Sequence, residues 1–73
     1  MGRYFLFAGD FYYPAGGWSD FQGDYSSEDA AVAEGQRGDF DWLEIVDSHL
    51  RVVVRRFQRS SGSRREWCEY HVE

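Results

Sequence analysis

Three segments in the second half of the chain alternate apolar and polar residues, and this alternation restricts the fold more than any other feature. The segments run over residues 39–47, 50–58 and 64–72. Successive side chains of a β-strand point to opposite faces, so such alternation predicts strands with one buried face. A pairing shift of one residue would turn the buried side chains to water. We therefore expect three consecutive antiparallel strands whose register follows the apolar pattern.

The connections between these segments predict which side chains share a face. Ser48-His49 indicates a two-residue turn, which sets Ile45 opposite Val52 and Leu43 opposite Val54. With an odd-length loop around Gly62, the face expected to form the core carries Leu43, Ile45, Leu50, Val52, Val54, Cys68, Tyr70 and Val72. The opposite face is expected to carry Trp42, Glu44, Val46, Arg51, Val53, Arg55, Phe57, Trp67, Glu69 and His71.

The first quarter of the chain contains a strand followed by an aromatic stretch. Residues 3–8 are apolar on both faces, which predicts a strand in the interior of the sheet. Residues 7–21 then combine six aromatic residues with three glycines and the only proline, Pro14. Gly16-Gly17 favours positive φ and Pro14 fixes a bend. We expect residues 9–25 to form an ordered loop on or beside the face opposite the core.

One helix is predicted between the aromatic stretch and the alternating segments. Ser26-Ser27-Glu28-Asp29 has the serine cap and first-turn acids typical of a helix start. An alanine-rich run continues the helix until Gly35 or Gly38 ends it. The predicted fold is therefore α+β, with the order β-α-β-β-β. We expect a single domain over residues 1–73, in which one helix covers one face of a mostly antiparallel four-stranded sheet.

The charge of the chain is acidic and unevenly distributed. The 73 residues carry thirteen acids and eight bases, for a net charge of −5, and every base is arginine. Residues 1–50 hold ten of the acids, whereas residues 51–73 hold six of the arginines. An acidic balance disfavours non-specific DNA binding as the main activity. A single cysteine excludes an internal disulfide, and no apolar run spans a membrane, so we expect a soluble intracellular protein.

Catalytic, metal-binding and cofactor-binding constellations are missing from the sequence. Cys68 and His71 lie three residues apart on a predicted strand, so their side chains point to opposite faces and do not share a metal. The glycines of the aromatic stretch are not followed by the lysine and helix start of a phosphate-binding loop. We therefore expect no catalytic residue, no metal and no cofactor, and predict that the protein is not an enzyme.

One pattern covers the first two-thirds of the chain. It comprises Tyr4-Phe5-Leu6-Phe7-Ala8-Gly9-Asp10, Tyr12-Tyr13-Pro14, Gly16-Gly17-Trp18, Asp20-Phe21, Gly23, Ser27-Glu28-Asp29-Ala30 and Asp41-Trp42-Leu43-Glu44-Ile45-Val46-Asp47. This pattern resembles a group of small uncharacterised proteins from phages and mobile elements. The resemblance implies a protein of the host cytoplasm during infection, and small acidic phage proteins include inhibitors of host defence such as anti-CRISPR proteins.

Three functions are consistent with these features. The first is an inhibitor of a host nucleic-acid-handling protein, such as a CRISPR effector, whose basic groove would bind phosphate-like acids. The acids proposed for this contact are Asp20, Asp24, Glu28, Asp29, Glu34, Asp39 and Asp41. The alternative for these acids is that they only solvate the helix and its flanks.

The other two functions use the arginine-rich and aromatic face of the sheet. In a single-strand nucleic-acid binder, aromatic rings would stack on bases and arginines would contact phosphates. The residues proposed for that role are Trp42, Arg51, Arg55, Phe57 and Trp67, with Arg56 and Arg59 as further phosphate contacts. In the third function, the same face or an edge strand joins two copies of the chain in a homodimer.

Overall fold

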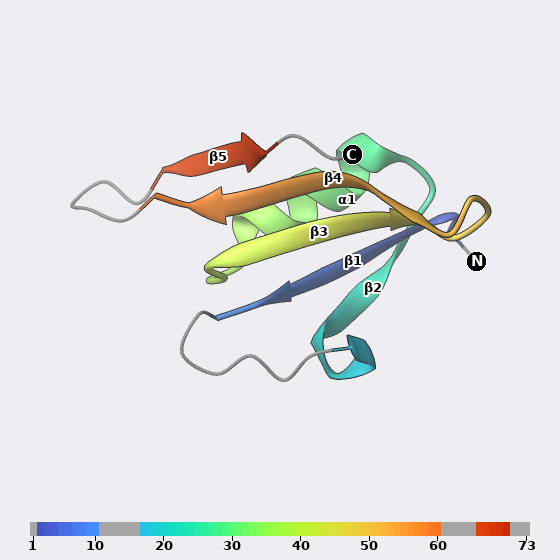
Figure 1. The fold of residues 1–73 in the computed structure, drawn as a ribbon, viewed down its shortest axis with the longest axis horizontal. Helices are drawn as coiled ribbons and strands as arrows, with labels where there is room; N and C mark the ends of the chain where they lie inside the picture. Colours follow the sequence, from blue (N-terminus) through green and yellow to red (C-terminus); the bar gives the residue numbers. More distant parts are fainter. Residues whose placement is uncertain (1, 11–16, 61–65, 71–73) are drawn as a thin grey trace.

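The computed structural model describes residues 2–10, 17–60 and 66–70. Its strands are β1 (Tyr4–Gly9), β2 (Phe21–Tyr25), β3 (Trp42–Asp47), β4 (Val52–Arg59) and β5 (Trp67–Tyr70). A short 3-10 helix, η1 (Gly17–Asp20), precedes β2, and the helix α1 (Glu28–Arg37) follows it. The strands form one antiparallel sheet in the order β2-β1-β3-β4-β5, with α1 on one face (Figure 1). The α+β class is confirmed, but the sheet has five strands where four were predicted.

The additional strand comes from the end of the segment predicted to be a loop. β2 pairs antiparallel with β1, with Tyr25 opposite Tyr4 and Phe21 opposite Phe7. β1 therefore lies between β2 and β3, in the interior position that its apolar faces predicted. Residues 11–16 of the predicted loop lie outside the described residues.

The helix begins within the predicted serine pair, but its cap is Ser27 and not Ser26, for which the sequence indicated a capping box with Asp29. Ser27 has extended backbone dihedrals, and its Oγ accepts a hydrogen bond of 3.1 Å from the backbone N–H of Ala30. The helix ends at Arg37, with Gly38 as the C-terminal cap, so the second of the two predicted glycines terminates it. Gly35 instead lies buried within the helix. A Cβ added to Gly35 would come within 2.7 Å of Leu43 Cδ2, so this glycine allows the helix to approach the sheet closely.

The core lies between α1 and the sheet. Its buried apolar residues are Leu6, Ala8, Ala31, Leu43, Ile45 and Phe57. The predicted burial of Leu43 and Ile45 is confirmed, and the predicted packing of the helix on their face is confirmed as well. Phe57 was predicted on the opposite face, and its burial shows that the predicted register of β4 is wrong.

The turn between β3 and β4 has four residues, at positions 48–51, rather than two. One carboxylate oxygen of Asp47 accepts hydrogen bonds from the backbone N–H of His49 (2.9 Å) and of Leu50 (3.2 Å). Arg51 closes the turn with a positive φ of 60°. This turn displaces the pairing by two residues, so Val52 lies opposite Asp47 and keeps its predicted face. A bulge between Ile45 and Val46 adds a third residue, and Leu43 therefore pairs with Phe57 rather than with Val54. Because the bulge adds a single residue, the faces of β4 are exchanged relative to the prediction from Arg55 onward.

The same exchange passes to β5 and corrects several further predictions. Phe57 pairs with Glu69 and Arg59 with Trp67, so these side chains lie on the helix face. Four residues predicted in the core are exposed, namely Leu50, Val52, Cys68 and Tyr70. Val54 packs against the core as predicted. His71 and Val72, also assigned to faces by the sequence, lie outside the described residues.

Candidate interaction surfaces

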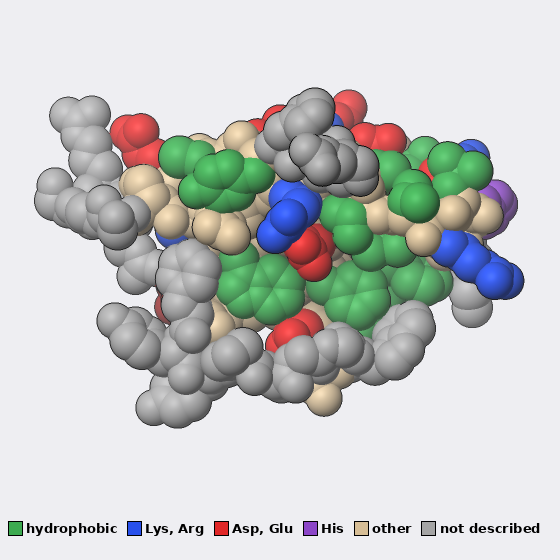
Figure 2. Space-filling view, in the orientation of Figure 1, with side chains coloured by type: hydrophobic (Ala, Val, Ile, Leu, Met, Phe, Trp, Pro, Cys, Tyr) green, Lys and Arg blue, Asp and Glu red, His purple; other side chains and the backbone are tan. Residues whose placement is uncertain are grey.

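The face of the sheet turned away from α1 is the first of two candidate surfaces, and we refer to it as the open face. The register places on it Phe5, Phe7, Phe21, Trp42, Glu44, Val46, Val53, Arg56, Gln58, Cys68 and Tyr70. One row crosses all five strands, from Phe21 through Phe7, Glu44 and Arg56 to Tyr70. Apolar side chains gather over this face, with basic and acidic side chains beside one another near its middle (Figure 2).

Aromatic rings form the β2 side of the open face. The ring of Phe21 meets those of Phe5 and Phe7 edge to face, with centroids 5.3 Å and 5.6 Å apart. Phe21 is nevertheless 36% exposed, and Tyr70 on the far strand is 44% exposed. The sequence pattern did not assign Phe5 and Phe7 to a surface. The alternation of Phe5 and Phe7 around the buried Leu6 was the available signal.

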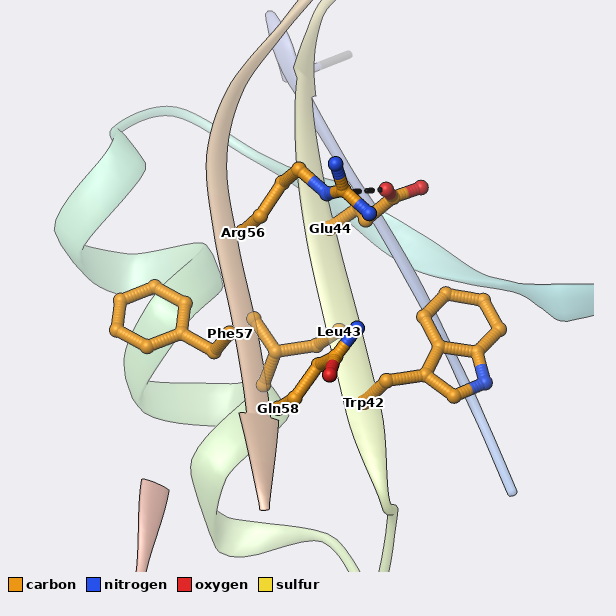
Figure 3. A pocket seen from close by; sticks show the side chains of 6 residues that line it. All are labelled: Trp42, Leu43, Glu44, Arg56, Phe57 and Gln58. Atoms are coloured by element: carbon orange, nitrogen blue, oxygen red, sulfur yellow. Dashed lines mark ion pairs between the residues drawn. The ribbon is translucent and has the colours of Figure 1, made fainter. Parts of the chain in front are cut away.

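Two shallow pockets adjoin Glu44 on the open face. One, of about 190 Å³, is lined by Trp42, Leu43, Glu44, Arg56, Phe57 and Gln58 (Figure 3). Within it, Arg56 Nε lies 3.0 Å from Glu44 Oε2, while Leu43 and Phe57 point toward the helix. The second, of about 240 Å³, is lined by Phe7, Asp20, Trp42, Glu44 and Val46. The middle of the open face is therefore hollowed on both sides of one ion pair.

The arginine and aromatic residues predicted to share one face are divided between several places. Trp42 lies on the open face, Arg51 lies in the turn at 48–51, and Arg55, Phe57 and Trp67 lie on the helix side. Phe57 belongs to the core, and the guanidinium of Arg59 stacks 4.3 Å from the ring centre of Trp67. The structure does not bring this predicted site together.

Arg55 interacts with three acidic side chains. Its Nε and Nη2 donate to the two carboxylate oxygens of Glu69, at 2.5 Å and 3.0 Å. Glu28 and Asp29 at the start of α1 lie 4.0 Å and 3.9 Å from Arg55 Nη1. The hydrogen bond to Glu69 raises the pKa of Arg55, and the same bond lowers the pKa of Glu69. These contacts tie β4 to β5 and to α1, so Arg55 has a structural role.

The seven predicted acidic residues form the second candidate surface only in part. Asp20 and Asp41 are buried and offer little surface to a partner. Glu28 is partly exposed, and Asp24, Asp29, Glu34 and Asp39 are exposed. We refer to these five as the acidic surface. Glu34 pairs with Arg37 at 2.8 Å, and Asp24 accepts a hydrogen bond from the backbone N–H of Gly2.

Tyr25 indicates that two of these acids lie close together. Its pKa is raised by burial first, and then by the negative charges of Glu34 and Asp24. Glu34 belongs to α1 and Asp24 to the edge strand β2. The fold therefore joins a helix acid and a strand acid around one phenol, although ten residues separate them in the sequence.

Two further features are absent from the part of the chain that the structure describes. No three histidine, cysteine, aspartate or glutamate side chains there lie together as ligands for a metal ion. No helix there has the length and apolar character needed to cross a membrane.

Comparison with known proteins identifies the family. A family model described as bacteriophage T4 protein Y07C matches residues 4–56, which is more than half of the chain. The chain belongs to the bacteriophage T4 protein Y07C family. The match runs from the start of β1 through Arg56 in β4, so the Y07C region includes both members of the ion pair on the open face. The resemblance to phage proteins is thus confirmed at the level of family.

The chain is also similar to a protein of Enterobacteria phage T4 described as "Uncharacterized 16.0 kDa protein in segB-ipI intergenic region". It is 36% identical over 63 residues, which cover 74% of the present chain and 46% of the relative. The chain thus spans about half the length of this relative. No solved structure matches the chain.

Proposed function

We propose that this Y07C family protein is a non-enzymatic inhibitor that acts in the host cell by binding a basic surface of a host nucleic-acid-handling protein. A CRISPR effector is one such target. The acidic surface provides the contact, with its carboxylates in the place of nucleic-acid phosphates. The observation that supports this proposal is that five of the seven predicted acids stay exposed or partly exposed on α1, its flanks and β2.

The position of the acidic surface is consistent with such a role. The net charge of −5 gives long-range attraction to a basic groove, and such attraction accelerates association at low salt. Glu28 and Asp29 both lie near Arg55, and Glu34 pairs with Arg37. The side chain of Asp29 is 99% exposed. Asp29 is therefore the acid of α1 that is most accessible to a partner.

The single-strand nucleic-acid binder receives less support from the geometry. It needs Trp42, Phe57 and Trp67 on one face, and they lie on two faces of the sheet. Arg55 and Arg59, proposed as phosphate contacts, are held by Glu69 and by backbone carbonyls. We therefore retain the acidic surface as the proposed contact.

The test uses a triple variant, Asp29→Asn, Glu34→Gln and Asp39→Asn, which removes three charges from exposed positions. Immobilised wild-type protein is expected to capture a host nucleic-acid-binding protein from lysate, and an added oligonucleotide is expected to displace it. The triple variant is expected to lose this capture, with affinity at least about tenfold weaker. Glu44→Gln, which removes a carboxylate from the open face, is the matched control and should capture as wild type does. Capture that withstands both the oligonucleotide and the triple variant would rule out phosphate mimicry.

A further inference from the structure

We propose that the open face binds the open face of a second copy of this chain, forming a two-fold symmetric dimer with the α1 helices on the outside. This inference does not depend on the proposed function, because the acids of α1 lie on the other side of the sheet and, of the acidic surface, only Asp24 lies at the edge of the open face. Three properties favour a second copy as the binding partner: the charges at the centre of the face, the net charge of the whole chain, and the size of the sheet.

The centre of the open face is self-complementary in charge. A two-fold interface brings each residue of a patch against the same patch of its partner, so an acid must meet a base when the copies are exchanged. Glu44 and Arg56 provide such a pair, 3.0 Å apart, and both side chains are partly exposed, at 33% and 45%. An axis passing between them places each Glu44 on the partner's Arg56. Each charge then gains a second opposite charge, and no unpaired charge is buried.

The open face also carries little of the chain's net negative charge. Its charged strand residues, among those the structure describes, are Glu44, Arg56 and, at the outer edge opposite Phe5, Asp24, and the buried Asp20 lines the pocket beside Glu44. The acids of α1 lie on the other side of the sheet. Two copies with a net charge of −5 each repel one another least when these faces meet. The same arrangement removes exposed aromatic surface at Phe21 and Tyr70 from water.

The size of the face sets the expected strength of the dimer. Five strands spaced about 4.8 Å apart, with about six residues of about 3.3 Å each, give a face of roughly 480 Å². Two such faces bury about 1,000 Å², which is near the lower limit for a specific interface. The pockets beside Glu44 can receive side chains of the partner and increase this contact. We therefore expect an association that depends on concentration, with a Kd in the micromolar range, about 1–100 μM.

Charge exchange across the dimer provides the test. Sedimentation velocity of the full chain between about 1 μM and about 1 mM should show a monomer–dimer equilibrium. In each copy, Glu44→Arg leaves two arginines at the centre of the open face, and Arg56→Glu leaves two acids there. Like charges then meet across the dimer, so each variant alone should dimerise at least about a hundredfold more weakly. An equimolar mixture of the two variants should restore dimerisation, because one chain then supplies both bases and the other both acids.

The restoration in the mixture separates a contact between chains from a structural role within one chain. Circular dichroism of each variant establishes that it is folded. The matched control exchanges an ion pair of similar length on α1, away from the open face: Glu34→Arg and Arg37→Glu should leave the dimer unchanged, separately and mixed. A wild-type chain that stays monomeric up to about 1 mM overturns the proposal. A dimer that is insensitive to Glu44→Arg, or folded variants that fail to associate on mixing, also overturns it.

Discussion

The Arg3 guanidinium donates two hydrogen bonds to the Asp47 carboxylate, of 2.9 Å from Nε and 2.7 Å from Nη2. Forty-four residues separate the two in sequence, and the pair fixes the start of β1 to the end of β3. Ser48 reinforces the connection, since its backbone N–H and its Oγ both donate to the Arg3 carbonyl. The same carboxylate accepts the hydrogen bonds that form the turn at 48–51. Asp47 thus connects the start of β1 to the turn that leads into β4.

This arrangement predicts a dependence of stability on acid. The Arg3 hydrogen bonds, with help from the backbone N–H groups of Leu50 and His49, hold the pKa of Asp47 at about 2, below its ordinary 3.8. The folded state therefore binds this proton less readily than the unfolded state. The stabilisation should be complete above pH 3.8 and should be lost as the pH falls toward 2. Urea unfolding at several pH values measures it.

The variant Asp47→Asn isolates the contribution of the carboxylate. It should unfold at lower urea than wild type at neutral pH, and the difference should narrow as the pH approaches 2. Asp29→Asn, at an exposed position, is the control and should follow wild type. A difference between Asp47→Asn and wild type that stays constant across the acid range would contradict the assignment.

The register of β4 can be tested by comparing Phe57 with Val52. Phe57→Ala removes a ring that is 6% exposed and should lower the free energy of unfolding by about 3–5 kcal/mol. Val52→Ala, at a position 49% exposed, should change it by no more than about 0.5 kcal/mol. Denaturant unfolding of the two variants gives both values. The two-residue turn predicted from the sequence would give the opposite order of effects.

Gly35 tests how closely α1 approaches the sheet. Alanine favours the helix by about 1 kcal/mol relative to glycine, but its Cβ would come within 2.7 Å of Leu43 and 3.0 Å of Leu6. Both leucines are almost fully buried, so making room costs about 1–3 kcal/mol. Gly35→Ala should therefore destabilise by up to about 2 kcal/mol, and Gly35→Val by more. Thermal unfolding measures this, with Ala33→Gly on the exposed side as the reference for propensity. A higher Tm for Gly35→Ala would mean that the helix lies farther from β3.

Two adjacent serines at the start of α1 should differ in their contribution to stability. Ser27→Ala removes the acceptor for the Ala30 N–H and should destabilise by about 1 kcal/mol. Ser26→Ala leaves that hydrogen bond in place and should have little effect. Equal losses from the two substitutions in thermal unfolding would show that Ser27 is not the cap.

Local features of the chain were predictable where neighbouring residues decide them. The serine cap, the alanine-rich run and the terminal glycine defined α1, because helix ends depend on hydrogen bonds within a few residues. Alternation placed Leu43 and Ile45 in the core and left Trp42, Glu44 and Val46 on the other side. β2 was missed because Phe21-Gln22-Gly23-Asp24-Tyr25 contains two residues with low strand propensity. Pairing with β1 compensates for them.

The candidate surfaces, too, were predictable from the sequence only in part. The sequence identified exposed acids such as Asp29 and Glu34, since charged residues on a helix of this composition face water. It could not show that Asp20 and Asp41 are buried, nor that Phe57 and Trp67 turn toward α1. Those outcomes depend on partners far away in the chain.

By itself, then, the sequence determined the α+β class, the approximate position of α1, the buried face of β3 and an acidic chain of the phage type. Only the tertiary structure decided the fifth strand, the faces of β4 and β5, and the row from Phe21 to Tyr70 across the open face. The physical reason lies in the turn held by Asp47 and in the bulge between Ile45 and Val46. The Asp47 carboxylate bonds simultaneously to Arg3, 44 residues away, and to the backbone of the turn at 48–51, while the bulge exchanges the faces beyond it, and no local pattern contains either feature.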